Sequence, residues 1–145
     1  MRVRTLISAI IVLFFIFVGI ALTQEKSNVK INKVPAPPTS PASGQEMYVN
    51  YCASCHGKDG KGNGPAAPAL KVPATDLTTL AKQNNGAFPS AHVANLLKGG
   101  AVAAHGSKDM PVWGPIFRSL STGHESQVQQ RIMNLTKYIE SMQVK

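Results

Sequence analysis

Apolar residues recur at helical spacing in the second half of the chain, most clearly near its C-terminus. There the apolar positions step by 4, 3, 4 and 3 residues through Val128, Ile132, Leu135, Ile139 and Met142. Such a stripe covers one face of a helix and is typical of a helix packed on a core. Thr122 and Glu125 precede the stripe with the spacing of a capping box, which predicts that the helix begins there.

Three shorter helices are predicted before it, over Gln45–Ser54, Thr75–Lys82 and Ser90–Lys98, because each has apolar residues on one helical face. Ser90 is the expected N-cap of the third helix, and Gly99-Gly100 is its expected stop.

Two stretches, Gly57–Pro73 and Ala101–Ile116, are predicted to be loops or irregular structure. No stretch alternates convincingly between apolar and polar residues, as a half-buried strand would. We therefore predict an all-α fold with long loops and one domain.

The N-terminal residues 1–24 differ from the rest. Arg2 and Arg4 precede an uncharged run of 20 residues, Thr5–Gln24, which is long enough to cross a bilayer. A membrane anchor is the preferred interpretation, and a cleaved signal peptide with a weak cut site at Gly19–Ala21 is the alternative. Either one predicts export, so that the domain lies on the periplasmic side, tethered to the inner membrane or soluble.

Residues 25–43 are rich in Pro, Lys and Ser and predict an extended linker. The domain is then expected over 44–145. The whole chain has a formal charge of +8, but from Gly44 on ten basic residues face six acidic ones, interleaved along the sequence. This pattern argues against a nucleic-acid-binding stripe.

The predicted domain is poor in large apolar side chains. Three of the five phenylalanines lie before residue 18, and few aromatic residues remain after Gly44. A domain of about 100 residues with so thin a core usually needs a disulfide, a metal or another added component.

Both cysteines of the chain lie in one short motif, Cys52-Ala53-Ser54-Cys55-His56. A disulfide would close too small a ring to add much constraint, and a thioredoxin-like dithiol needs strands that are not predicted. A zinc site needs two more ligands at suitable spacing. The remaining chemistry for C-x-x-C-H is covalent attachment of haem c.

The helical spacing explains the motif. Residues three apart share a helix face, so Cys52 and Cys55 can each form a thioether to one porphyrin. His56 is then the expected proximal iron ligand. The cofactor is predicted to be one covalently bound haem c per chain, which also supplies the missing apolar body of the core.

Met110 is the preferred second axial ligand. It lies in the loop sequence KDMPVWG, where Pro111 removes a backbone donor and restricts the chain. His105 is the next candidate, whereas Met133 and Met142 are expected to pack on the last helix. Trp113 is expected to pack at the haem edge.

These motifs resemble those of monohaem class I c-type cytochromes, including the haem-c subunits of bacterial terminal oxidases. The resemblance runs from about Gly44 to Met142 and rests on CASCHG, GPAAPAL and KDMPVWG. It implies a domain wrapped around one haem, with the first and last helices crossing at Gly44 and Tyr138.

The resemblance also implies roles for the loop after the motif. A proline carbonyl in this family accepts the second N–H of the proximal histidine. Pro68 matches that proline, with Pro65 as the competing assignment, and Leu70 matches a leucine that packs on the haem.

The predicted function is one-electron transfer in a respiratory or other periplasmic redox chain, without catalysis by this chain itself. A haem-based sensor with a labile sixth position is the alternative, and a catalytic haem such as a peroxidase is disfavoured. Four lysines flank the motif loops and are candidates for a ring that steers an acidic partner protein. They are Lys58, Lys61, Lys98 and Lys108, and for each an ordinary solvated surface lysine is the alternative.

Overall fold

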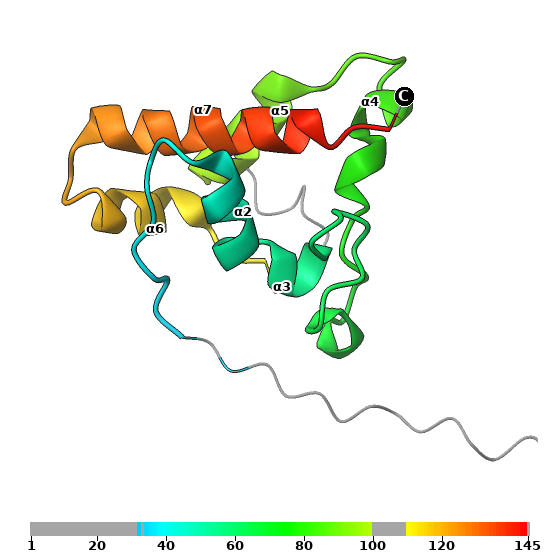
Figure 1. Cartoon of the computed structure of the whole chain (residues 1–145), viewed down its shortest axis with the longest axis horizontal. Coiled ribbons are helices and arrows are strands. Elements are labelled where there is room, and N and C mark those ends of the chain that lie inside the picture. The colour runs from blue at the N-terminus through cyan, green and yellow to red at the C-terminus, as the bar shows by residue number, and fades with distance from the viewer. Residues whose placement is uncertain (1–31, 33, 100–109, 145) are drawn as a thin grey trace, which may run out of the picture.

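The computed structural model describes residues 32, 34–99 and 110–144. Within them the structure is helical and contains no strand, which confirms the predicted fold class (Figure 1). The longer helices are α2 (Gly44–Tyr51), α5 (Ser90–Lys98), α6 (Trp113–Leu120) and α7 (Glu125–Ser141). The short ones are α3 (Ala53–His56), η1 (Ala67–Ala69), η2 (Leu77–Thr79) and α4 (Leu80–Gln83).

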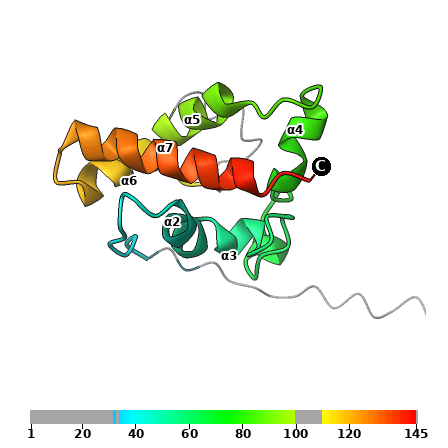
Figure 2. The same ribbon diagram turned by 45° about the horizontal axis from the view of Figure 1, so that its top comes forward.

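Helix α7 is the centre of the arrangement. It packs against α2 on one side and against α5 and α6 on the other (Figure 2). Gly44 makes the contact with α2 possible, because a Cβ atom there would overlap the backbone oxygen of Asn134 and meet the Tyr138 side chain. The crossing expected at Gly44 and Tyr138 is therefore present.

Aromatic side chains make up much of the core between these helices. The Tyr51 ring stacks on Trp113 with a centroid distance of 5.1 Å, and Trp113 stacks on Phe117 at 5.7 Å. Tyr48, Phe117 and Leu135 are completely buried. Tyr51, Trp113 and Phe117 thus form one cluster of rings, and Tyr48 pairs separately with Tyr138 at a centroid distance of 5.3 Å.

The helix boundaries differ from the prediction where side chains bond the backbone. The predicted helix 45–54 is divided at Cys52, so that α2 ends at Tyr51 and α3 continues to His56. The predicted helix 75–82 begins later, since the Asp76 carboxylate accepts the Thr78 N–H at 2.8 Å and caps the chain there.

Helix α5 has the predicted bounds, but Ser90 is its first residue and Pro89 occupies the N-cap position. The prediction of Ser90 as N-cap is therefore wrong. The helix stops at Gly99, whose φ of 102° is disfavoured for residues with a side chain. The predicted irregular stretch 101–116 is wrong at its end, because α6 begins at Trp113.

The capping box before α7 is also wrong. His124 is the N-cap, and Thr122 has a φ of 49° with its hydroxyl donating to the Ser121 carbonyl at 2.8 Å. Because Thr122 lies two residues before this N-cap, its hydroxyl does not cap the helix. The packing expected of Met133 is wrong as well, since half of its surface is exposed.

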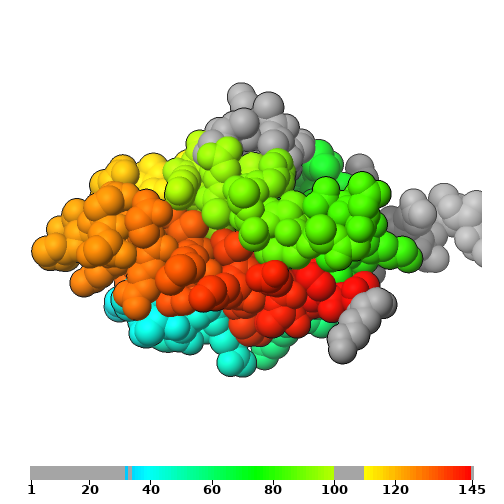
Figure 3. Space-filling model, turned by 90° about the horizontal axis from the view of Figure 1, so that it is seen from above, coloured from blue at the N-terminus to red at the C-terminus, as the bar shows by residue number. Residues whose placement is uncertain are grey.

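The residues just before α2 are bound to the domain. Thr39 is buried, and the Asn134 side-chain amide donates to the Pro41 carbonyl at 2.9 Å. The chain segment preceding α2, cyan in Figure 3, lies against the orange part of α7. The folded region thus includes the last residues of the predicted linker.

Several predictions fall on residues that the structure does not describe. These are the N-terminal segment 1–24 and the residues Gly100, His105 and Lys108. Among the helices it does describe, none is long and apolar enough to cross a membrane.

Candidate functional site

The cysteine motif forms a tight turn at the junction of α2 and α3. The N–H groups of Cys55 and His56 both donate to the Cys52 carbonyl, at 3.1 and 2.9 Å. Cys52 is buried, whereas Cys55 and His56 are half-buried. The turn brings both thiols and the imidazole to the wall of one cavity. The three residues that the sequence singled out thus line the same cavity.

Burial controls the protonation of the motif. It raises the pKa of the Cys52 thiol to about 12, with the neighbouring Cys55 adding to the effect. Burial also lowers the pKa of His56, although a hydrogen bond to the Thr75 carbonyl acts in the opposite direction. His56 is therefore neutral at pH 7, which is the form in which imidazole binds a metal.

The His56 ring is oriented by Thr75. Its Nδ1 atom lies 2.9 Å from the Thr75 carbonyl oxygen, so the neutral ring donates from Nδ1 and keeps the lone pair on Nε2. The predicted bond to the Pro68 carbonyl is wrong, and Pro68 does not line the cavity. Pro68 lies in η1, at the exposed end of the loop, while the loop returns to His56 only near Thr75.

The cavity continues from the motif between the helices. It has a volume of about 210 Å³ and is partly open to solvent. Its remaining walls are mostly apolar and come from the loop after the motif, from α5, from the start of α6 and from α7. They include Leu70, Leu77, Leu80, Val93, Leu97, Trp113 and Ile139. Leu70 and Trp113, the two residues predicted to surround the haem, are thus both in the cavity wall.

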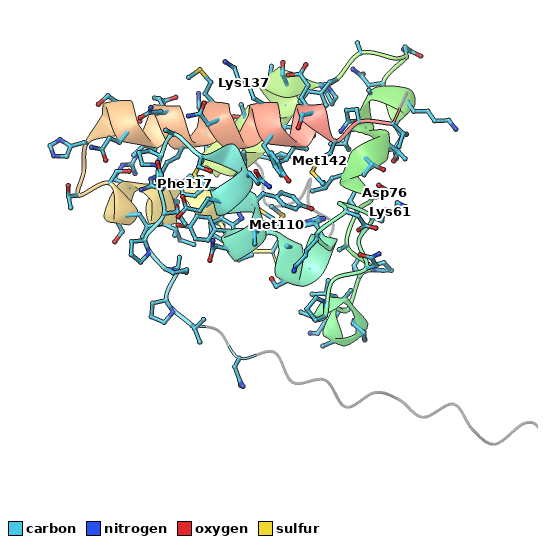
Figure 4. All side chains as sticks on the ribbon, in the orientation of Figure 1. Lys61, Asp76, Met110, Phe117, Lys137 and Met142 are labelled. Carbon is cyan, nitrogen blue, oxygen red and sulfur yellow. The ribbon has the colours of Figure 1, made fainter. Side chains whose placement is uncertain are left out.

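Two side chains that could bind iron line the cavity in addition to the motif, Met110 and His92. Figure 4 shows Met110 in the space beneath α7 and Met142 at the C-terminal end of that helix. Met142 and Met47 are absent from the cavity wall.

Some residues of the site were missed by sequence reasoning. Tyr51 and Thr75 line the cavity without having been assigned a role. Tyr51 could have been found from its position directly before Cys52, at the end of the apolar face of the first helix. Thr75 acts through its backbone carbonyl, so its side chain contains no clue to its role.

Comparison with known proteins decides which family this is. The family model described as "Cytochrome C oxidase, cbb3-type, subunit III" matches residues 39–121, more than half of the chain. The chain belongs to the family of subunit III of cbb3-type cytochrome c oxidase. No curated protein and no solved structure matches. The match begins at Thr39, the first buried residue of the described chain, and ends just before α7.

Membership of this cytochrome c family implies haem c and electron transfer. The cavity fits such a cofactor in chemistry, because thiols and a neutral imidazole stand at one wall and apolar side chains form most of the others. Among the residues that are described, no group of three His, Cys, Asp or Glu side chains could hold a bare metal ion.

Proposed function

We propose that this protein is a one-electron carrier of a periplasmic respiratory chain, acting on its own or as a subunit of an oxidase complex. The observation that supports it is an apolar cavity whose wall contains Cys52, Cys55, His56 and Met110 together. The family match supports the same class of function. The chain itself needs no catalytic group for this task.

The proposal assigns a role to each of these residues. Cys52 and Cys55 would each form a thioether to the haem, and His56 would bind the iron through Nε2 while Thr75 holds its Nδ1. Met110 would supply a thioether sulfur as the second protein ligand. A haem held in this way supplies reversible one-electron transfer at a potential that methionine raises relative to a second histidine. Leu70 and Trp113 exclude water from the site.

We further propose that residues 1–24 anchor the chain in the inner membrane, or serve as an export signal, and that residues 25–43 tether the domain over 44–145. The uncharged run of the first segment and the family match support export to the periplasmic side.

The absorption spectrum tests the proposed ligand. We expect the oxidised wild-type protein to show a methionine-to-iron charge-transfer band, which Met110→Ala abolishes while the haem stays attached. The reduced variant is then expected to bind carbon monoxide rapidly, because its sixth position has no protein ligand. Met133→Ala is the matched control, since Met133 is half-exposed on α7 and absent from the cavity.

Two results would contradict the assignment. A charge-transfer band that survives Met110→Ala, or that is missing from the wild type, excludes Met110 as the ligand. Rapid carbon monoxide binding by the reduced wild type would instead favour the haem-sensor alternative, in which the sixth position is labile.

The redox partner is proposed to have an acidic docking surface. Lys58, Lys61 and Lys98 are exposed, and they lie on the motif loop and on α5, the elements that build the cavity. Lys61 also stands 3.9 Å from Asp59, but both side chains are largely exposed, so this pair contributes little.

Ionic strength tests the docking proposal. The rate of electron transfer to an acidic redox protein, measured by stopped flow, is expected to fall by about tenfold or more from low to high salt. Lys98→Glu should reduce the low-salt rate, while Lys137→Glu, on the exposed face of α7, should leave it nearly unchanged. A rate that is the same at all salt concentrations would eliminate steering by these lysines.

A further inference from the structure

One arginine is buried in the folded domain. Arg131 on α7 is only 3% exposed, and its guanidinium bonds to neutral groups. Its Nε donates to the Ser121 hydroxyl at 3.1 Å, Nη1 donates to the Thr39 hydroxyl at 3.0 Å, and Nη2 donates to the Thr39 carbonyl at 2.9 Å. The ion pairs found in the described part of the chain, Lys61–Asp59 and Arg118–Glu125, do not include it.

The charge on Arg131 is therefore not cancelled by a neighbour. A guanidinium cannot lose its proton in a protein, so it remains a full positive charge when buried. Its neutral partners satisfy its hydrogen bonds but leave its field acting on the surrounding core, where screening is weaker than in water.

Hydrogen bonds connect this charge to the cavity. The Thr39 hydroxyl that accepts from Arg131 lies 2.7 Å from the Tyr51 hydroxyl, and Tyr51 also donates to the Pro37 carbonyl at 2.7 Å. The Tyr51 ring lines the cavity and stacks on Trp113. A chain of two hydrogen bonds thus leads from Arg131 to the cavity wall.

The position of Arg131 on α7 also places its charge near the cavity. Ile139 lines the cavity eight residues after Arg131. At 1.5 Å per residue the separation along the helix axis is roughly 12 Å. A charge at that distance through the core acts on the cavity, whereas a solvated charge would be largely screened.

We propose that Arg131 sets the reduction potential of the site by its buried charge and holds Tyr51 in the cavity wall through Thr39. The inference rests on the proposed electron-carrier function. A positive charge stabilises the reduced state of the site relative to the oxidised state. Arg131 therefore raises the reduction potential. Arg131 is a positioning residue, because it does not line the cavity. It lies in α7, outside the residues that the family model matches.

The midpoint potential of the haem-loaded protein tests the inference. Arg131→Gln removes the charge, and a shift to lower potential is expected. Arg131→Lys preserves the charge in a similar volume and should shift the potential much less. Equal shifts in these two variants would overturn the inference, because they would show a packing effect and not an effect of charge.

A second pair of variants preserves the test if Arg131→Gln does not fold. Thr39→Asp places a carboxylate beside the guanidinium, where it can accept the same hydrogen bonds and neutralise the charge. Thr39→Asn is the neutral control of the same shape. The potential is expected to fall in the aspartate variant and to stay close to the wild-type value in the asparagine variant. Equal potentials in the two variants would overturn the inference.

Failure of this inference can be told apart from failure of the proposed function. The spectra of the same samples report whether haem is attached and whether the methionine band is present. If the proposed function is wrong, the wild type lacks one of these features. If only the role of Arg131 is wrong, both features are present in every variant and the potential does not follow the charge.

Discussion

A chain in which Cys52 and Cys55 are both replaced by serine is expected to contain no covalently bound haem. The two thiols are the only ones in the sequence, so no other residue can form the thioethers. Haem staining of a denaturing gel should detect the wild type and should not detect the double variant. Ser54→Ala is the matched control, because Ser54 is exposed between the two cysteines.

The same double variant should also lose most of its stability. Without the macrocycle, the apolar cavity wall formed by α5, α7 and the motif loop is exposed to water. The free energy of unfolding is expected to fall by several kcal/mol. In a domain of this size each kcal/mol lowers the Tm by about 4–8 °C. Thermal unfolding followed by circular dichroism measures it. A haem-free variant with the same Tm as the wild type would refute the view that the cofactor completes the core.

The second large effect is expected at Gly44. In Gly44→Ala the new Cβ would overlap the Asn134 backbone oxygen, and neither backbone can move away without separating α2 from α7. Since α7 is the centre of the fold, we expect a loss of about 3 kcal/mol or more in the free energy of unfolding.

Chemical denaturation of the haem-loaded protein measures that loss. Gln45→Ala is the matched control, because Gln45 is the next residue of α2 and is exposed. Its free energy of unfolding should lie within about 0.5 kcal/mol of the wild-type value. A Gly44→Ala variant as stable as this control would mean that the two helices do not approach as closely as the structure shows.

The features that were predicted correctly from the sequence depend on residues that lie close together in the chain. The motif of Cys52, Cys55 and His56 is contiguous, so a single helical turn determines that the three side chains share a face. The same holds for the stripe on α7 and for the bounds of α5, where a glycine with positive φ ends the helix. The family resemblance added the crossing at Gly44, and the structure confirms it.

Other features were mispredicted because they depend on contacts between distant segments. His56 bonds the Thr75 carbonyl and not that of Pro68, and the path of the loop decides which carbonyl returns to the ring. A residue pattern contains no information on that path. The start of α7 was misplaced for a local reason, because a turn with a φ of 49° at Thr122 places His124 at the N-cap.

The sequence by itself determined the helical class and the C-x-x-C-H motif, and it predicts Met110 as the axial ligand. These depend on residue type and on spacing within a few positions. The tertiary structure alone decided that Met110 and His92 share the cavity with the motif, and that Thr39 closes over Arg131. Thr39 and Arg131 are 92 residues apart, so their contact and the burial of the charge follow from how α7 packs beside α2.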